Sequence, residues 1–254
     1  MDLWQSFKIA FSMYSVIPLR NIEWKEETMR YAFCFFPLIG VVIGGAEWLW
    51  LWCAWKFGFS AVLTGAAAAV IPVLLTGGIH LDGFCDTVDA LSSHQPKERK
   101  LEILKDSHVG AFAVIGICVY FLLSFGLWCE YQYSVESAFI LGGGFVLSRA
   151  LSGLVSVLAP QARKEGMLKT FSDAAKQRAV VISCAAFLGV TAVGMLAVDR
   201  RMALAVLAVM AIILGYYLLT SRRQFGGVTG DLAGYFLTLA EMGVLVGVVL
   251  AQHW

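Results

Sequence analysis

Long runs of apolar residues, separated by short polar segments, fill most of the chain after residue 30. Seven of these runs approach the length of about 20 residues that a helix needs to cross a membrane. They lie near 31–55, 59–79, 109–128, 136–158, 179–198, 202–220 and 232–251. Ahead of them, Trp4, Phe7, Phe11 and Tyr14 recur at helical spacing. This spacing predicts an amphipathic helix that lies along the membrane surface or packs against the bundle.

The pattern predicts an all-α fold, a polytopic membrane bundle of about seven transmembrane helices plus the N-terminal amphipathic helix. Residues 1–254 are expected to form a single integral-membrane domain, because no internal repeat or low-complexity tract interrupts the pattern. The composition agrees with a membrane protein. The 59% of hydrophobic residues is more than a soluble core needs, and only 15% of the residues are charged. Six scattered cysteines without a CxxC pair favour neither a disulfide framework nor a zinc site. A net charge of +1 gives no reason to expect nucleic-acid binding.

Lysine and arginine are distributed unevenly between the two sides of the predicted bundle. With the N-terminus in the cytoplasm, the segments on that side hold 15 of the 19 basic residues. They are Lys8, Arg20, Lys25, Arg30, Lys97, Arg99, Lys100, Lys105, Arg163, Lys164, Lys169, Lys176, Arg178, Arg222 and Arg223. The positive-inside rule favours this orientation. Every polar motif of the chain is then expected to face the cytoplasm.

A polar stretch at 80–93 places three carboxylates on one face of a predicted helix. Asp82, Asp86 and Asp89 are spaced four and then three residues apart, so at about 100° per residue they share one stripe. A bound Mg²⁺ ion would offset the repulsion among the three carboxylates, because Mg²⁺ binds carboxylate and phosphate oxygens together. The alternative is a solvated acidic face on which Asp82 caps the helix. His80, just ahead of the stripe, is a candidate metal ligand or a candidate hydrogen-bond donor to a phosphate. Alternatively, it positions the carboxylates.

A second motif, Lys105-Asp106-Ser107-His108, lies immediately before the third apolar run. As a functional unit it offers a metal ligand in Asp106, a proton acceptor in His108 and a phosphate contact in Lys105. The alternative is an ordinary helix start, with Asp106 or Ser107 as the N-cap residue.

A third motif is the glycine-rich loop 226–231, which precedes the last apolar run. Glycines let backbone N–H groups approach a phosphate, and the N-terminus of a following helix favours anions. Arg222 adds positive charge beside the loop, whereas the Gly-Lys-Ser/Thr ending of a Walker loop is missing. Asp231 is either a helix cap or a further metal ligand.

Three ionisable residues fall inside the apolar runs. Arg149 and Glu241 lie at similar depths, about 13–14 Å from the cytoplasmic ends of their runs. Because intramembrane charges are costly and normally paired, they are expected to pair with each other or to line one polar cavity. Glu47 lies nearer the outer end and has no evident partner.

Together these motifs resemble those of the cobalamin synthase (adenosylcobinamide-GDP ribazoletransferase) family. The segments that carry the resemblance are His80-Leu81-Asp82-Gly83, Asp86-Thr87, Asp89-Ala90-Leu91, Lys105-Asp106-Ser107, Gly110-Ala111, Ser148-Arg149 and Gly227-Val228-Thr229-Gly230-Asp231. They occur in the family's order over essentially the whole chain. One departure is visible before Ile17-Pro18, where the family tends to carry an arginine and this chain does not. The role of that arginine is therefore either absent or moved to Arg20.

The resemblance implies an integral-membrane transferase of the bacterial cytoplasmic (inner) membrane, with a cytoplasmic active face. It implies joining of adenosylcobinamide-GDP to α-ribazole or its 5′-phosphate, with release of GMP and Mg²⁺ as cofactor. The expected metal ligands are Asp82, Asp86, Asp106 and Asp231, and the expected proton acceptor is Asp89 or His108. The expected substrate-binding residues are His80, Lys105, Ser107, Arg149, Arg222, Gly227, Thr229 and Gly230. The sequence leaves open whether the protein forms a homo-oligomer.

Three other functions compete with this interpretation. CDP-alcohol phosphotransferases share part of the aspartate pattern, but Asp86 stands where their signature has Ala-Arg. Prenyl-diphosphate enzymes usually need two aspartate-rich motifs, and the glycine-rich loop offers Asp231 alone. A secondary transporter would use Arg149 and Glu241 along a substrate path, yet the acids cluster at one face of the membrane.

Overall fold

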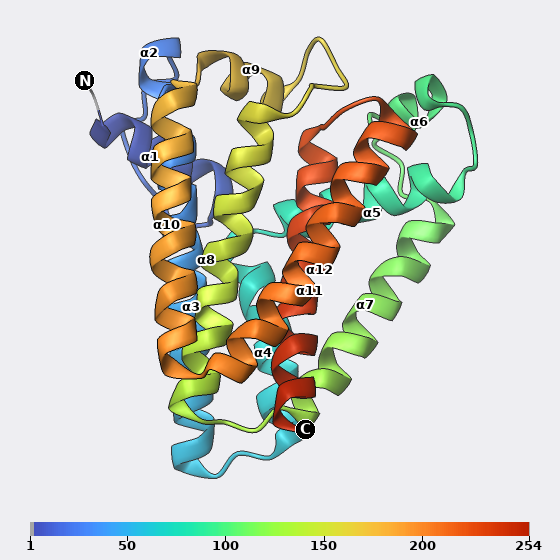
Figure 1. The fold of residues 1–254 in the computed structure, drawn as a ribbon. Helices are drawn as coiled ribbons and strands as arrows, with labels where there is room; N and C mark the ends of the chain where they lie inside the picture. Colours follow the sequence, from blue (N-terminus) through green and yellow to red (C-terminus); the bar gives the residue numbers. More distant parts are fainter. Residues whose placement is uncertain (1–2, 254) are drawn as a thin grey trace.

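The structure, a computed structural model, describes residues 3–253, which form helices connected by loops without a β-strand (Figure 1). The long helices are α3 (Ala32–Phe57), α7 (Ala111–Glu130), α8 (Val135–Leu158), α10 (Gln177–Val198), α11 (Arg200–Thr220) and α12 (Gly230–Gln252). The shorter helices are α1 (Leu3–Tyr14), α2 (Glu26–Met29), α4 (Ala61–Thr76), α5 (Ile79–Ser92), α6 (Lys97–Ile103), α9 (Met167–Ala174) and the π-helix η1 (Ser221–Phe225).

The described residues contain 6 helices long and apolar enough to cross a membrane, or up to 7 if α4 and α5 count as one span. This confirms the predicted bundle of about seven helices. The second span ends earlier than predicted, because the chain bends by 97° between α4 and α5. At the bend, Gly77 and Gly78 adopt φ angles of 65° and 79°, which glycine tolerates far better than other residues. As a result α5 runs in a different direction from α4.

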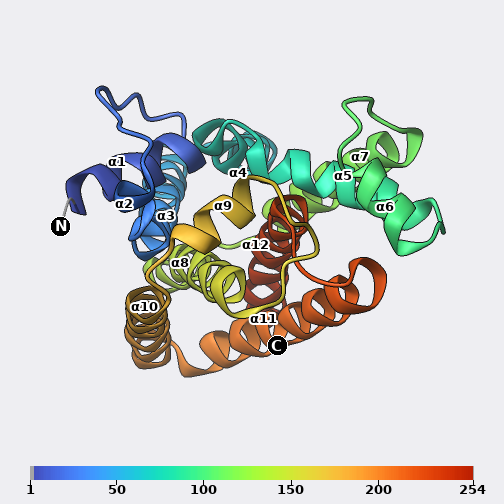
Figure 2. The ribbon, with the colours of Figure 1, turned by 90° about the horizontal axis from the view of Figure 1, so that it is seen from above.

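The polar segments that were predicted to be cytoplasmic gather at one end of the molecule. Helices α1, α2, α6 and α9 lie at this end, and the C-terminal end of α12 lies at the other (Figure 1). Seen from the same end, α9 lies over the end of α8, and α1 lies beside α3 (Figure 2).

The N-terminal helix α1 packs against the bundle, which is one of its two predicted placements. It contacts α3 and buries Ile9, Ala10 and Phe11, whereas Trp4 remains 63% exposed. Its buried residues therefore face α3.

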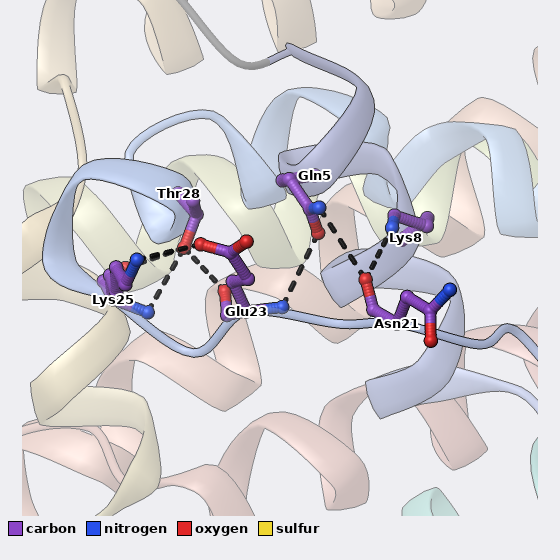
Figure 3. Close-up of polar contacts among 6 residues, drawn as sticks. All are labelled: Gln5, Lys8, Asn21, Glu23, Lys25 and Thr28. Carbon is purple, nitrogen blue, oxygen red and sulfur yellow. Dashed lines mark hydrogen bonds and ion pairs between the residues drawn. The ribbon is translucent and has the colours of Figure 1, made fainter.

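A network of hydrogen bonds fastens α1 to the connection before α3 (Figure 3). The buried Lys8 donates from Nζ to the carbonyl of Asn21 at 2.5 Å. The Gln5 side chain accepts a hydrogen bond from the Glu23 amide at 3.3 Å and donates to the Asn21 carbonyl at 3.4 Å. Thr28 donates from Oγ1 to the carbonyl of Glu23 at 2.6 Å. These bonds fix the position of α1 at the end of the bundle.

Helices α5 and α12 cross with their backbones in direct contact. A Cβ atom at Gly83 would lie 2.7 Å from the carbonyl oxygen of Asp231, and one at Gly234 would lie 2.8 Å from that of His80. Thr238 also donates from Oγ1 to the His80 carbonyl at 3.3 Å. Only glycine permits such an approach. The crossing places the first turn of α12 beside the acidic face of α5.

We expect Gly83→Ala to destabilise the protein by about 1–3 kcal/mol, because the added methyl group meets backbone that cannot yield locally. The unfolding free energy in detergent micelles measures this effect. Gly126→Ala on α7 is the matched control, since a Cβ there meets nothing within 4 Å. Equal stability of the two variants would contradict the close crossing of α5 and α12.

Candidate active site at the crossing of α5 and α12

The predicted acidic helix is confirmed as α5, which carries Asp82, Asp86 and Asp89. Its N-cap residue is Gly78, so the alternative in which Asp82 merely caps the helix is wrong. Asp82 is exposed and Asp86 is half-buried.

Asp231, in the first turn of α12, reaches the same acidic face. Burial and the nearby charges, first Asp82 and then Asp231, raise the pKa of Asp86 to about 6. A carboxylate is shifted in this direction when it loses solvent and is crowded by other anions. We define Asp82, Asp86 and Asp231 as the acidic patch. Its crowding would be relieved by a bound cation.

Asp89 serves a different purpose from the one predicted for it. Its Oδ2 accepts a hydrogen bond from the Gly110 amide at 2.7 Å, and its Oδ1 accepts one from the Ala113 amide at 2.8 Å. Both oxygens thus bind the N-terminus of α7, where a negative charge also interacts favourably with the helix dipole. The geometry assigns Asp89 to holding α7 against α5 and argues against its predicted role as proton acceptor.

The motif at 105–108 forms an exposed loop separate from the acidic patch. Asp106 Oδ1 accepts a hydrogen bond from the His108 amide at 3.0 Å and lies 2.6 Å from His108 Nδ1. These hydrogen bonds lower the pKa of Asp106, and the charges that act on it belong to His108 and Arg99. The structure therefore does not bring the predicted metal ligand Asp106, or Lys105 and Ser107 beside it, into the patch.

Backbone amides of the glycine-rich loop donate hydrogen bonds to carbonyl groups of neighbouring segments. The Val228 amide donates to the Pro160 carbonyl at 2.9 Å, and the Gly227 amide donates to a carbonyl of η1. A Cβ at Gly227 would lie 2.4 Å from the Pro160 oxygen. Thr229 is the N-cap of α12, and its Oγ1 accepts from the Leu232 amide at 3.2 Å. The Gly227 amide is therefore engaged within the protein, and the phosphate contact predicted for Gly227 stays a prediction without support from this geometry.

Arg163 is the site residue that the sequence interpretation missed. Its Nη1 lies 3.3 Å from Asp231 Oδ2, and its Nη2 donates to the Leu101 carbonyl at 3.0 Å. Its Nε is buried without a partner in the described part of the chain. The predicted cation Arg222 is exposed on η1, and Gly230 is exposed at the start of α12. The clue to Arg163 was the basic loop 159–178 on the same side of the membrane.

Arg149 and Glu241 form an ion pair between α8 and α12, as their common depth predicted. The Arg149 side chain has no exposed surface, so the substrate contact predicted for it is not supported. Glu47 is 1% exposed, and neither carboxylate oxygen has a hydrogen-bond partner among the described residues. The carboxyl groups of Glu47 and Glu241 interact electrostatically. The interior below the site thus holds two carboxyl groups for one guanidinium.

A cavity of about 290 Å³ lies beside the acidic patch, with Asp82 and Asp231 in its wall. His80 lines the same cavity, and its ring centroid lies 6.2 Å from that of Tyr14 and 6.1 Å from that of Phe36. The end of α1 therefore forms part of the site.

Within residues 3–253, no group of three or more His, Cys, Asp or Glu side chains lies close enough together to hold a metal ion. The donor set of the acidic patch nevertheless suits Mg²⁺ in kind. Mg²⁺ usually binds through one or two carboxylates, water and substrate phosphates, and not in an all-protein cage.

We expect Arg149→Met to destabilise the protein by about 3–5 kcal/mol, because it leaves Glu241 and Glu47 buried without a cation. The double variant Arg149→Met/Glu241→Met should recover most of this loss, since an apolar pair replaces the ions. Unfolding in detergent micelles measures both changes, with Arg99→Met as control because its pair with Glu102 is exposed. A double variant no more stable than the single one would contradict the buried pair.

Comparison with known proteins gives one consistent family. The family model described as cobalamin-5-phosphate synthase matches residues 6–249. An adenosylcobinamide-GDP ribazoletransferase of Lachnoclostridium phytofermentans is 46% identical over 98% of both chains. Proteins of the same name are 31% identical in Clostridium perfringens, over 96% of this chain and 97% of the relative, and 32% identical in Desulfitobacterium hafniense, over 94% of each.

No solved structure matches this chain. The family model and the relatives span almost its full length, and the resemblance noted in the aspartate motifs agrees with both. The chain therefore belongs to the cobalamin-5-phosphate synthase family.

Proposed function

We propose that this protein is an adenosylcobinamide-GDP ribazoletransferase that works at the cytoplasmic face of a bacterial inner membrane. The observation that carries the proposal is the 46% identity with a relative of that name over 98% of the chain. The site is consistent with it, because acidic residues, a cation and a cavity meet at one end of the bundle. Family membership favours this activity over the phosphotransferase, prenyltransferase and transporter alternatives.

The reaction transfers the phosphoryl group that carries cobinamide from GMP to an alcohol. A ribose hydroxyl of α-ribazole, or of its 5′-phosphate, attacks the phosphate attached to cobinamide, and a new P–O bond forms. The P–O bond to GMP breaks, GMP leaves with the electron pair, and the hydroxyl proton is released. Such a transfer depends mainly on positioning the reactants and on neutralising the charge of the transition state.

The acidic patch is the proposed binding site for Mg²⁺. Asp82 and Asp86 on α5 would hold the ion, with Asp231 as a further ligand. When bound, Mg²⁺ would neutralise charge on the diphosphate of the donor substrate. The raised pKa of Asp86 supports this proposal, because burial and neighbouring carboxylates make its anionic form costly until a cation is present.

Arg163 and the groups around it have complementary roles in this proposal. Arg163 contacts Asp231 and retains an unpartnered Nε, so it orients Asp231 and can also bind a phosphate oxygen. Its guanidinium thereby takes the place that the sequence interpretation gave to Arg222.

We expect Asp82→Asn and Asp86→Asn to reduce GMP release from adenosylcobinamide-GDP and α-ribazole at least about 100-fold, because each removes charge that positions the metal. Purified protein in detergent, assayed with Mg²⁺ and with EDTA, gives the measurement, and EDTA should abolish turnover. Glu136→Gln is the control, since Glu136 is exposed in the first turn of α8. Full activity of the Asp82 and Asp86 variants, or in EDTA, would refute the metal assignment.

A further inference from the structure

Two cavities of different chemistry share Asp231 in their walls. The larger, of about 290 Å³, lies between α1, α3, α5, α8, α9 and α12, and its walls are mostly apolar. Aromatic side chains of Tyr14, Phe33 and Phe36 line it. The smaller, of about 90 Å³, is polar, and its lining includes the cations Arg163 and Lys169, the acidic residues Glu165 and Asp231, and Thr229 and Gly230 at the start of α12. Asp231 therefore lies between an apolar chamber and a polar one that contains two cations.

The wall of the apolar chamber holds a buried hydroxyl group and a buried ring nitrogen that has no partner among the described residues. Ser152, on α8, lines the chamber and is 2% exposed. The His80 ring is 9% exposed and its Nε2 is buried without a partner. Buried polar groups are normally hydrogen-bonded, because leaving them unpaired is costly. A ligand in the chamber would supply the missing partner.

We propose that the apolar chamber binds α-ribazole, the acceptor substrate, an inference that rests on the proposed function. The flat benzimidazole ring of α-ribazole lies among Tyr14, Phe33 and Phe36, whose aromatic rings stabilise it. Ser152 and His80 donate or accept hydrogen bonds to the nucleoside and fix its orientation. The ribose then lies at the wall formed by Asp82 and Asp231, beside the phosphate that is transferred.

The other parts of the substrates fit this chamber less well. The corrin ring is far larger than a cavity of about 290 Å³. Guanine carries hydrogen-bonding groups along most of its edge, and burying them against the mostly apolar walls of this chamber is costly. The diphosphate is anionic and complements Arg163 and Lys169 in the smaller chamber. Size, polarity and charge thus leave the benzimidazole riboside as the occupant.

We expect Ser152→Ala to raise the KM for α-ribazole about 3- to 10-fold, as loss of one neutral hydrogen bond implies. The KM for adenosylcobinamide-GDP should change less than about twofold, because that substrate binds elsewhere. Calorimetric titration of α-ribazole into the enzyme without the second substrate should show the same loss of affinity. Ser183→Ala is the control, since Ser183 lies on α10 and bonds to the Cys34 carbonyl.

A second variant tests the chamber without touching its buried wall. Met167 lines the cavity but is 61% exposed, so Met167→Trp should fold normally and narrow the chamber. We expect at least about a 10-fold rise in the KM for α-ribazole, through steric exclusion. Unchanged α-ribazole affinity in both variants, or a selective rise in the KM for adenosylcobinamide-GDP, would overturn this inference. Absence of GMP release from the wild-type protein would instead refute the proposed function.

Discussion

The contact between the backbones of α5 and α12 is the constraint on which the site depends. Gly83 and Gly234 let the two helices approach until there is no room for a side chain between them. Because α5 bends away from α4 at Gly77 and Gly78, its acidic face meets the first turn of α12. Three carboxylates from two distant parts of the sequence thereby come to act on one another.

The surrounding structure holds this crossing in place from several sides. Asp89 fastens the N-terminus of α7 to α5 through two backbone hydrogen bonds. The ion pair between Arg149 and Glu241 joins α8 to α12 in the interior of the bundle. On the remaining side, the polar network of α1 positions Tyr14 against the ring of His80. The site is thus assembled from rigid helices, as the alignment of reacting groups requires.

Hydrophobic periodicity and charge predicted the helices, the common end of the polar segments and the pairing of Arg149 with Glu241. These features follow from local pattern and depth, which a sequence records directly. The local sequence pattern does not predict which distant residue forms a hydrogen bond or an ion pair with a given polar group. Asp89 looked like a third member of the acidic stripe, whereas in the fold it binds two amides of α7. The Gly227 amide looked free to bind a phosphate, whereas in the fold it donates to a carbonyl of η1. The sequence could not place Arg163 in the site, because its contact with Asp231 joins a loop to the first turn of α12, far away in the sequence.

Binding of Mn²⁺, a paramagnetic substitute for Mg²⁺, tests most directly whether the crossing of α5 and α12 creates a cation site. Titration of the purified protein, followed by electron paramagnetic resonance, gives the dissociation constant for the wild-type protein and two variants. The account predicts that Asp231→Asn weakens Mn²⁺ binding at least about 10-fold, while Asp106→Asn leaves it within about twofold. Binding that is unaffected by Asp231→Asn, or that depends on Asp106, would contradict it.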